Sequence, residues 1–182
     1  MRKIIIVWAF ALVTTACGTT SGIRQSDTTA GALVLDFSSY NSVLVTDFKD
    51  GTENRSVPED VGSDFAERIV GAIRGKEVFD IVTEDPSEIS DRAIVIGGDI
   101  TRYAKGNAAL KLLVGFGAGS TFFDSNVVVS DFTSQEQLGV IVVDRNSWAL
   151  GGLVAASQSV SDFMNDAAEK IAVELVLSLI HI

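Results

Sequence analysis

The sequence contains very few of the residues that most catalytic and metal sites require. Its one cysteine, Cys17, excludes an internal disulfide. Its one histidine, His181, lies next to the end of the sequence. A nucleophile–histidine arrangement would depend on that single position, and a zinc site would lack the clustered histidine and cysteine ligands that it needs. We therefore expect no metal, no cofactor and no catalytic centre of these kinds.

Basic residues are also scarce, with 14 Lys and Arg against 24 Asp and Glu, which gives a formal net charge of −10. Such an acidic chain repels the phosphates of nucleic acids and anionic lipid headgroups. We expect no nucleic-acid partner and interpret the acidity as a solvated surface. No motif in the sequence identifies a small-molecule ligand.

The first apolar run is a processing signal rather than part of the fold. Arg2 and Lys3 precede an apolar stretch at residues 4–13, which is too short for a permanent membrane span. Small residues then lead to Cys17. This arrangement resembles the bacterial lipoprotein signal, in which the cysteine is lipidated, although Thr14 stands where that signal usually has leucine. An ordinary secretory leader with a chance cysteine is the alternative.

Lipidation at Cys17 predicts a protein held by a membrane anchor in the bacterial cell envelope. Position 18 is glycine rather than aspartate, so the inner-membrane retention signal of enteric bacteria is missing. The outer membrane, facing the periplasm, is therefore favoured. We divide the chain into a signal peptide (residues 1–16), a flexible tether (residues 17–31) and one α+β periplasmic domain (residues 32–182).

The remaining pattern predicts an α+β domain with a single mixed or antiparallel sheet of about five strands. Runs of β-branched residues indicate strands at 41–48, 78–83, 93–103, 121–132 and 138–145, with weaker indications at 32–37 and 108–116. Gly97 and Gly98 inside one run suggest a bulge or a close backbone approach. Helical spacing of apolar residues predicts two main helices packed on the sheet, at residues 59–76 and 160–179.

Three stretches carry a family resemblance: G-D-I-T-R-Y-A-K-G, L-L-V-G-F-G-A-G-S and V-V-V-S-D-F-T-S-Q-E-Q-L. They resemble an uncharacterised family of bacterial lipoproteins, known as a domain of unknown function (number four-four-one-zero), and the likeness extends over residues 43–176. The resemblance implies a cell-envelope lipoprotein with a compact α/β domain, and it supplies no catalytic residue. A looser similarity of layout to periplasmic modules of other outer-membrane lipoproteins, including the curli-secretion channel, concerns the fold only.

Three apolar segments are candidate contact surfaces. The G-F-G-A-G run at residues 115–119 suggests a structural turn, a packing surface or a phosphate loop, but a phosphate loop would need a following helix and a lysine. The segment W-A-L-G-G-L-V-A-A-S at residues 148–157 is either a buried crossover or a partner surface. The stretch at residues 173–182 is apolar nearly all round and is either buried or an association surface. The candidate partner residues are Trp148, Leu150 and Leu153.

These observations predict a non-enzymatic binding or assembly module that is anchored to the outer membrane and binds envelope proteins or itself. One alternative is a pore or secretion-channel subunit, in which residues 108–131 and 137–157 insert as membrane strands. A weaker alternative is a glycan-active envelope enzyme, which would need two convergent carboxylates. The candidate carboxylates are Asp99, Asp124, Asp131 and Asp144.

Overall fold

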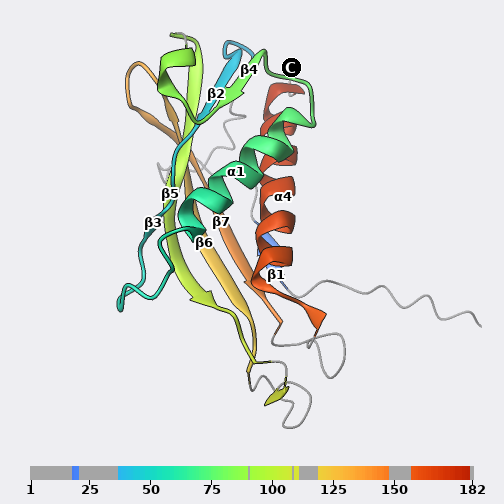
Figure 1. The fold of residues 1–182 in the computed structure, drawn as a ribbon. Helices are drawn as coiled ribbons and strands as arrows, with labels where there is room; N and C mark the ends of the chain where they lie inside the picture. Colours follow the sequence, from blue (N-terminus) through green and yellow to red (C-terminus); the bar gives the residue numbers. More distant parts are fainter. Residues whose placement is uncertain are drawn as a thin grey trace, which may run out of the picture.

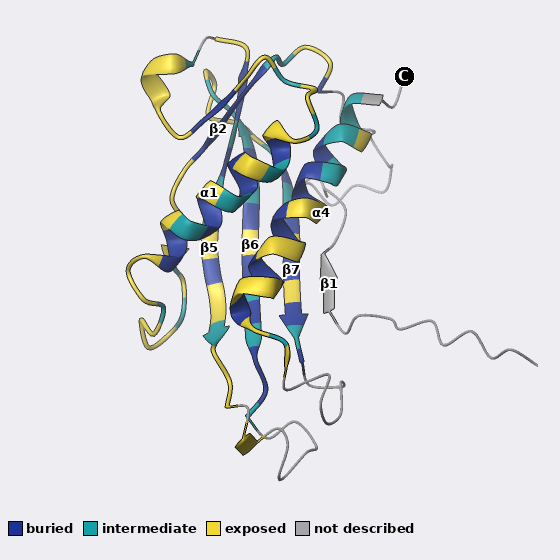
Figure 2. Cartoon of the chain, turned by 45° about the vertical axis from the view of Figure 1, so that its right-hand side comes forward, coloured by how far each residue is buried: buried dark blue, intermediate teal, exposed yellow. Residues whose placement is uncertain are grey.

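The computed structural model describes residues 18–20, 37–89, 91–107, 109–110, 119–147 and 157–180. In this part of the chain one sheet is covered by two long helices, α1 (Val61–Arg74) and α4 (Val160–Ile180) (Figure 1). The predicted α+β class, with two main helices on a single sheet, is confirmed. Both helices lie against the same face, so the described residues place no helix over the opposite face (Figure 2).

The sheet has seven strands in the order β1–β7–β6–β5–β2–β4, and β3 also pairs with β5. Their bounds are β1 Gly18–Thr20, β2 Ser42–Val45, β3 Lys49–Asp50, β4 Ile81–Thr83, β5 Ala93–Ala104, β6 Phe122–Asp131 and β7 Gln137–Asn146. β5, β6, β7 and β1 are antiparallel neighbours. β2 pairs in parallel with β4 and β5, and β3 pairs in parallel with β5, so the sheet is mixed. The count exceeds the predicted number by two, since β1 and β3 are too short to be indicated by a sequence pattern.

The long strands β5, β6 and β7 form the centre of the sheet, as their β-branched composition predicts. Alternate residues of β6, from Phe123 to Val129, are fully buried, while the residues between them are half-buried or exposed. Gly98 has a φ of 145°, and a Cβ added there would lie 2.0 Å from the Asn126 carbonyl oxygen. The predicted close backbone approach therefore occurs between β5 and β6.

Helix α1 begins after the acidic pair Glu59 and Asp60 and ends before Gly75, close to the predicted bounds. Its apolar residues recur every three or four positions and form one buried stripe. Phe65, at the middle of this stripe, is fully buried, and its ring centroid lies 4.8 Å from those of Phe48 and Phe123. The first helix is therefore fixed on the sheet by an aromatic cluster.

Helix α4 packs beside α1 on the same face of the sheet. A hydrogen bond from Arg68 to the Asn165 side chain connects the two helices, and Lys76, in the turn after α1, forms an ion pair with Glu169 of α4. Near the end of α4, Leu175 is fully buried whereas Leu177 is 44% exposed, so the apolar end of this helix is only partly covered. Among the described residues, no helix combines the length and the apolarity needed to cross a membrane.

The core lies between the helices and the sheet (Figure 2). Burying a large apolar side chain contributes about 1.5–3 kcal/mol, so this layer accounts for most of the favourable free energy of folding. The largest fully buried side chains are Phe37, Val43, Phe65, Ile69, Ile73, Ile94, Ile96, Ile100, Phe123, Ile141, Ile171 and Leu175.

Three parts of the chain differ from the sequence-based expectations. Gly18–Thr20, expected to belong to a flexible tether, pair with β7. In the strand expected at 108–116, only residues 109–110 are described, and they are helical because the Asn107 side chain accepts a hydrogen bond from the Leu110 N–H at 3.2 Å. In the strand expected at 32–37, only Phe37 is described, and it lies outside any strand. The other boundaries of the leader and tether stay predictions.

Candidate functional site

Four ends of secondary-structure elements meet at one end of the sheet, at the bottom of Figure 1. β5 ends there, β6 begins there, β7 ends there, and α4 begins there. We call this region the loop end and define it by residues 105–107, 119–121, 147 and 157–159. Two apolar segments of the sequence, around residues 111–118 and 148–156, are joined to the described fold here.

Thr121 holds the loop end together. It is fully buried, and its Oγ1 lies 3.2 Å from the carbonyl oxygens of both Lys105 and Gln158. Its backbone N–H donates to Ser147 Oγ at 2.9 Å, and the Ser147 N–H donates to the Thr121 carbonyl at 3.1 Å. One buried threonine thus fixes the connection between β5 and β6 against the connection between β7 and α4.

A pair of glycines closes the β5–β6 connection. Gly106 and Gly119 both have a φ of 71°, a left-handed conformation that favours glycine. The Asn107 N–H donates to the Gly119 carbonyl at 2.8 Å, and a Cβ on Gly106 would lie 2.6 Å from that oxygen. Gly119 therefore has the structural role that the G-F-G-A-G run allowed. The other two glycines of that run, Gly115 and Gly117, lie outside the described residues.

The described residues next to the predicted lipid site and on both sides of the predicted partner segment lie at the same end of the molecule. Cys17 lies outside the described residues, but Gly18 next to it is paired with Arg145 near the end of β7. The partner segment begins after Ser147 and returns before Ser157, and both of these residues belong to the loop end. The predicted partner residues themselves are outside the described residues: Trp148, Leu150 and Leu153.

Two of the four candidate carboxylates lie side by side on the helix-free face. Asp124 of β6 is directly opposite Asp144 of β7 and, on its other side, opposite Arg102 of β5. Burial and the charge of Asp144 raise the pKa of Asp124 to about 6, although the Arg145 backbone N–H, 3.3 Å away, and Arg102 act in the other direction. Neither carboxylate lines the cavity that is described below, between the first turns of α1 and α4. The carboxylate pair that the glycan-enzyme alternative requires therefore lies on the surface of the strands and outside this cavity.

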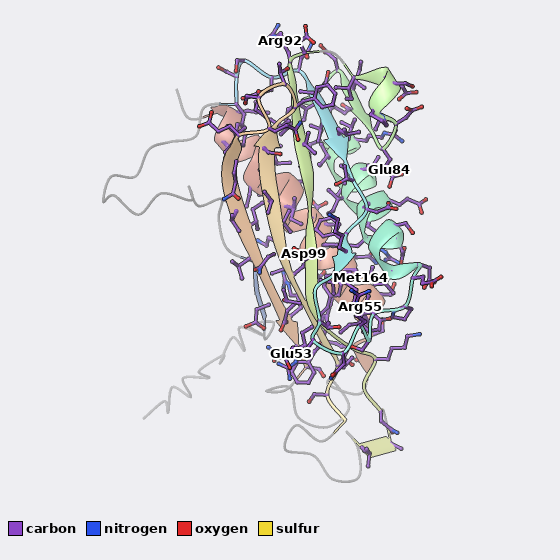
Figure 3. All side chains as sticks on the ribbon, turned by 90° about the vertical axis from the view of Figure 1, so that its left-hand side faces the viewer. Glu53, Arg55, Glu84, Arg92, Asp99 and Met164 are labelled. Atoms are coloured by element: carbon purple, nitrogen blue, oxygen red, sulfur yellow. The ribbon has the colours of Figure 1, made fainter. Side chains whose placement is uncertain are left out.

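The other two carboxylates lie elsewhere. Asp99 faces Asn126 across the strands (Asp99 is labelled in Figure 3). Asp131 holds the turn after β6, where its carboxylate accepts from the Ser134 N–H at 2.6 Å and from the Tyr40 hydroxyl at 3.0 Å. These bonds hold the pKa of Asp131 below its usual value, while burial and Asp131 raise the pKa of Tyr40 to about 12. Asp131 is therefore a turn residue.

The sequence did not reveal a cavity of about 350 Å³ between the first turns of α1 and α4 and the end of β5. We call it the helix-end cavity. Its lining comes from three segments that are far apart along the chain, so no local motif could indicate it. The lining residues are Pro58, Asp60, Val61, Asp64, Tyr103, Lys105, Ser159, Val160, Ser161 and Met164.

The regions that the pore alternative would insert into a membrane, residues 108–131 and 137–157, contain β6 and β7. Alternate residues of these strands, among them Phe123 and Ile141, belong to the buried core. In their described parts, both regions therefore form the centre of the folded domain.

Solved structures share this fold. The PelC dodecamer from Paraburkholderia phytofirmans is 14% identical, with a TM-score of 0.57 over 87% of this chain and 96% of that chain. A variant of the same dodecamer is 15% identical with the same TM-score. XCC0632 from Xanthomonas campestris is 12% identical, with a TM-score of 0.48 over 75% of this chain and 86% of that chain. At these identities the PelC likeness shows the fold alone.

No curated protein matches the sequence. A family model described as "Domain of unknown function (DUF4410)" matches residues 32–151. This match covers well over half of the chain and includes β2 to β7 together with α1. The protein therefore belongs to the DUF4410 family, as the resemblance of its glycine- and valine-rich stretches predicted.

Proposed function

We propose that the protein is a lipoprotein of the bacterial outer membrane, attached through Cys17 and facing the periplasm, that acts by binding or assembly rather than by catalysis. One observation carries this proposal. Gly18, next to the predicted lipid site, pairs with the end of β7, and the apolar W-A-L-G-G-L-V-A-A segment leaves the fold from that same end. The anchor and the candidate contact segment therefore act together at the loop end.

Self-association is the mode of assembly that we favour. PelC, which shares the fold, was solved as a dodecamer. The core between helices and sheet already contains a full set of buried aromatic and aliphatic side chains. Burial of further apolar surface against a second copy would contribute about 25 cal/mol for each Å² removed from water. The net charge of −10 opposes association of like chains, so the contact must be apolar and should strengthen when salt screens the repulsion.

The scarcity of catalytic side chains supports the proposed non-enzymatic role. The sequence offers one cysteine, which lipidation would consume, and one histidine next to its end. The carboxylate pair of Asp124 and Asp144 lies on the open face of the sheet. We therefore propose that the protein acts by binding other proteins, or further copies of itself, through its surface.

Lipidation is tested by replacing Cys17 with serine in cells labelled with radioactive palmitate. We expect the wild-type protein to carry label and to sediment with membranes, and the Cys17→Ser variant to lose both. Undiminished label in the variant would show that Cys17 is not the attachment site.

Assembly is tested by analytical ultracentrifugation of the lipidated protein in detergent, with a double substitution of Leu150→Ser and Leu153→Ser. We expect the wild type to form a species larger than a monomer, more so at higher salt, and the double variant to be monomeric with an unchanged melting temperature. The matched control replaces an apolar pair near β4, Val78 and Ile81, which are 42% and 36% exposed. A monomeric wild type, or equal loss in the control, would refute assembly through this segment.

A further inference from the structure

The helix-end cavity has an apolar floor and a polar rim. Its floor is formed by Val61, Val160 and Met164, which are only 7%, 6% and 2% exposed. Met164 lies in the lower half of the molecule, toward the loop end, in Figure 3. A volume of about 350 Å³ is at the lower end of the range for small-ligand sites, about 300–1,000 Å³. The cavity can therefore enclose one large side chain together with its flanking polar groups.

The polar groups on the rim differ in the hydrogen bonds and ion pairs that they already make within the chain. The Asp64 carboxylate binds the Arg68 guanidinium at 2.9 and 3.0 Å. Asp60, at the start of α1, makes no side-chain capping hydrogen bond. Burial, together with the charges of Asp60 and Asp64, raises the pKa of the Tyr103 hydroxyl, which therefore stays protonated. Asp60 therefore lines the cavity without a capping bond of its own, and Tyr103 lines it while its side chain packs against the core.

The charge around the cavity is negative. The first turns of α1 and α4 and the residues before them carry four carboxylates, of Glu59, Asp60, Asp64 and Asp162. Against these stand Arg68, which is engaged with Asp64, and Lys105 on the rim. The net charge of −10 on the whole chain adds a field of the same sign. A cationic partner is therefore attracted, and an acidic one is repelled.

We propose that the helix-end cavity binds a segment of a partner protein in which a large apolar side chain lies next to a lysine or arginine. The apolar side chain covers Val61, Val160 and Met164, and its cationic neighbour pairs with Asp60. Tyr103 and Lys105 line the same cavity and supply hydroxyl and ammonium donors for the main-chain carbonyls of the segment. The inference goes beyond the proposed function, because the cavity lies within one chain and needs neither the lipid anchor nor self-association.

Met164 gives a direct readout of this site. The sequence has two methionines, Met1 in the predicted leader and Met164 on the floor of the cavity. The experiment is a titration of the full protein, labelled with ¹³C at the methionine methyl groups and held in phosphatidylcholine nanodiscs, with the signal assigned by Met164→Leu. The probes are the capped dipeptides Ac-Phe-Arg-NH₂, Ac-Phe-Glu-NH₂ and Ac-Ala-Arg-NH₂. We expect the Met164 signal to shift in a saturable way with the first probe and far less with the other two.

Two surface variants separate the cavity from general electrostatic attraction. Asp60→Asn should weaken Ac-Phe-Arg-NH₂ binding by about two- to fivefold, the effect of one partly exposed ion pair. Glu59→Gln removes the same charge one residue away, at a position that does not line the cavity, and should weaken binding clearly less than Asp60→Asn does. No saturable shift, an equal response to Ac-Phe-Glu-NH₂, or equal loss in both variants would overturn the proposal. A shift caused by phosphatidylglycerol nanodiscs without peptide would overturn it in favour of a lipid.

Discussion

The two faces of the central strands differ in burial, although successive residues of the same strands supply them in turn. On the face toward the helices, Ile96, Val127 and Ile141 are completely buried. On the other face, Val128 and Val140 are half-buried and Val142 is 42% exposed. Since both faces are rich in valine, valine content does not distinguish them, and what covers each face does. Apolar content alone does not show which face of a strand is the core.

The helix-free face also carries a group of charged side chains, whereas the covered face of these strands buries one, Arg145. Arg102, Asp124 and Asp144 lie in one row across β5, β6 and β7. The Arg102 guanidinium lies 3.4 Å from the centroid of the Phe122 ring and is attracted to it by a cation–π interaction. Stability is therefore concentrated on one side of the sheet, while the other side tolerates groups whose protonation responds to pH.

The strongest test of this contrast places one charge on each side. Phe65→Asp buries a carboxylate where the aromatic rings of Phe48 and Phe123 now pack, and we expect a loss of about 4 kcal/mol or more in the free energy of unfolding. Val142→Asp on the open face should cost less than about 1 kcal/mol. Urea denaturation measures both. Similar losses would mean that the two faces are not energetically distinct.

A second test compares two glycines within α1. A Cβ at Gly62 would lie 2.0 Å from the Phe48 carbonyl oxygen, whereas a Cβ at Gly71 has no atom within 4 Å. Gly62→Ala should destabilise by about 1–3 kcal/mol, because the first turn of α1 must move away from the segment between β2 and β3 that contains Phe48. Gly71→Ala should stabilise by about 0.5–1 kcal/mol, the usual gain in a helix. Thermal melts of the two variants should move in opposite directions, and a shift in the same direction would contradict the packing of α1.

The periodicity of the sequence was sufficient to predict α1, α4 and the three central strands. It could not predict β1, because Gly18–Thr20 are a very short run of small and polar residues, and their partner β7 is far away along the chain. It also could not predict the helical residues 109–110. Their apolar composition suggested a strand, whereas in the structure the Asn107 side chain accepts a hydrogen bond from the Leu110 N–H, as a helix cap does. The helix-end cavity could not be predicted from the sequence for a different reason. Asp60, Tyr103 and Met164 are far apart along the chain and are brought together by the tertiary fold.

The last effect that we predict concerns pH. The pKa of Asp124 is about 6 in the folded protein, against about 3.9 for an unfolded aspartate. The folded state thus binds this proton more tightly, so the associated stability is present below about pH 4 and is lost as pH rises through about 6. Asp124→Asn should be more stable than wild type at pH 7.5 by about 1–2 kcal/mol, a value discounted for solvent around the pair.

The control for this prediction is Asp144→Asn, which removes the neighbouring charge and keeps the Asp124 carboxyl. It should lower the pKa of Asp124 and reduce the pH dependence without abolishing it. Measurement of unfolding free energy from pH 4 to pH 8 decides the point. A wild-type curve as flat as that of Asp124→Asn would show that the pair does not shift the protonation of Asp124.

The most direct test of the account is site-specific photocrosslinking in intact cells, with a benzophenone amino acid at Trp148 or at Ser87. Trp148 follows directly on the loop end, whereas Ser87 lies in the short η1 turn (Pro86–Glu88), toward the opposite end of the sheet (Figure 1). The account predicts protein adducts from position 148, to a second copy or an envelope partner, and none from position 87. Adducts from position 87 alone, or from neither position, would contradict assembly through the loop end.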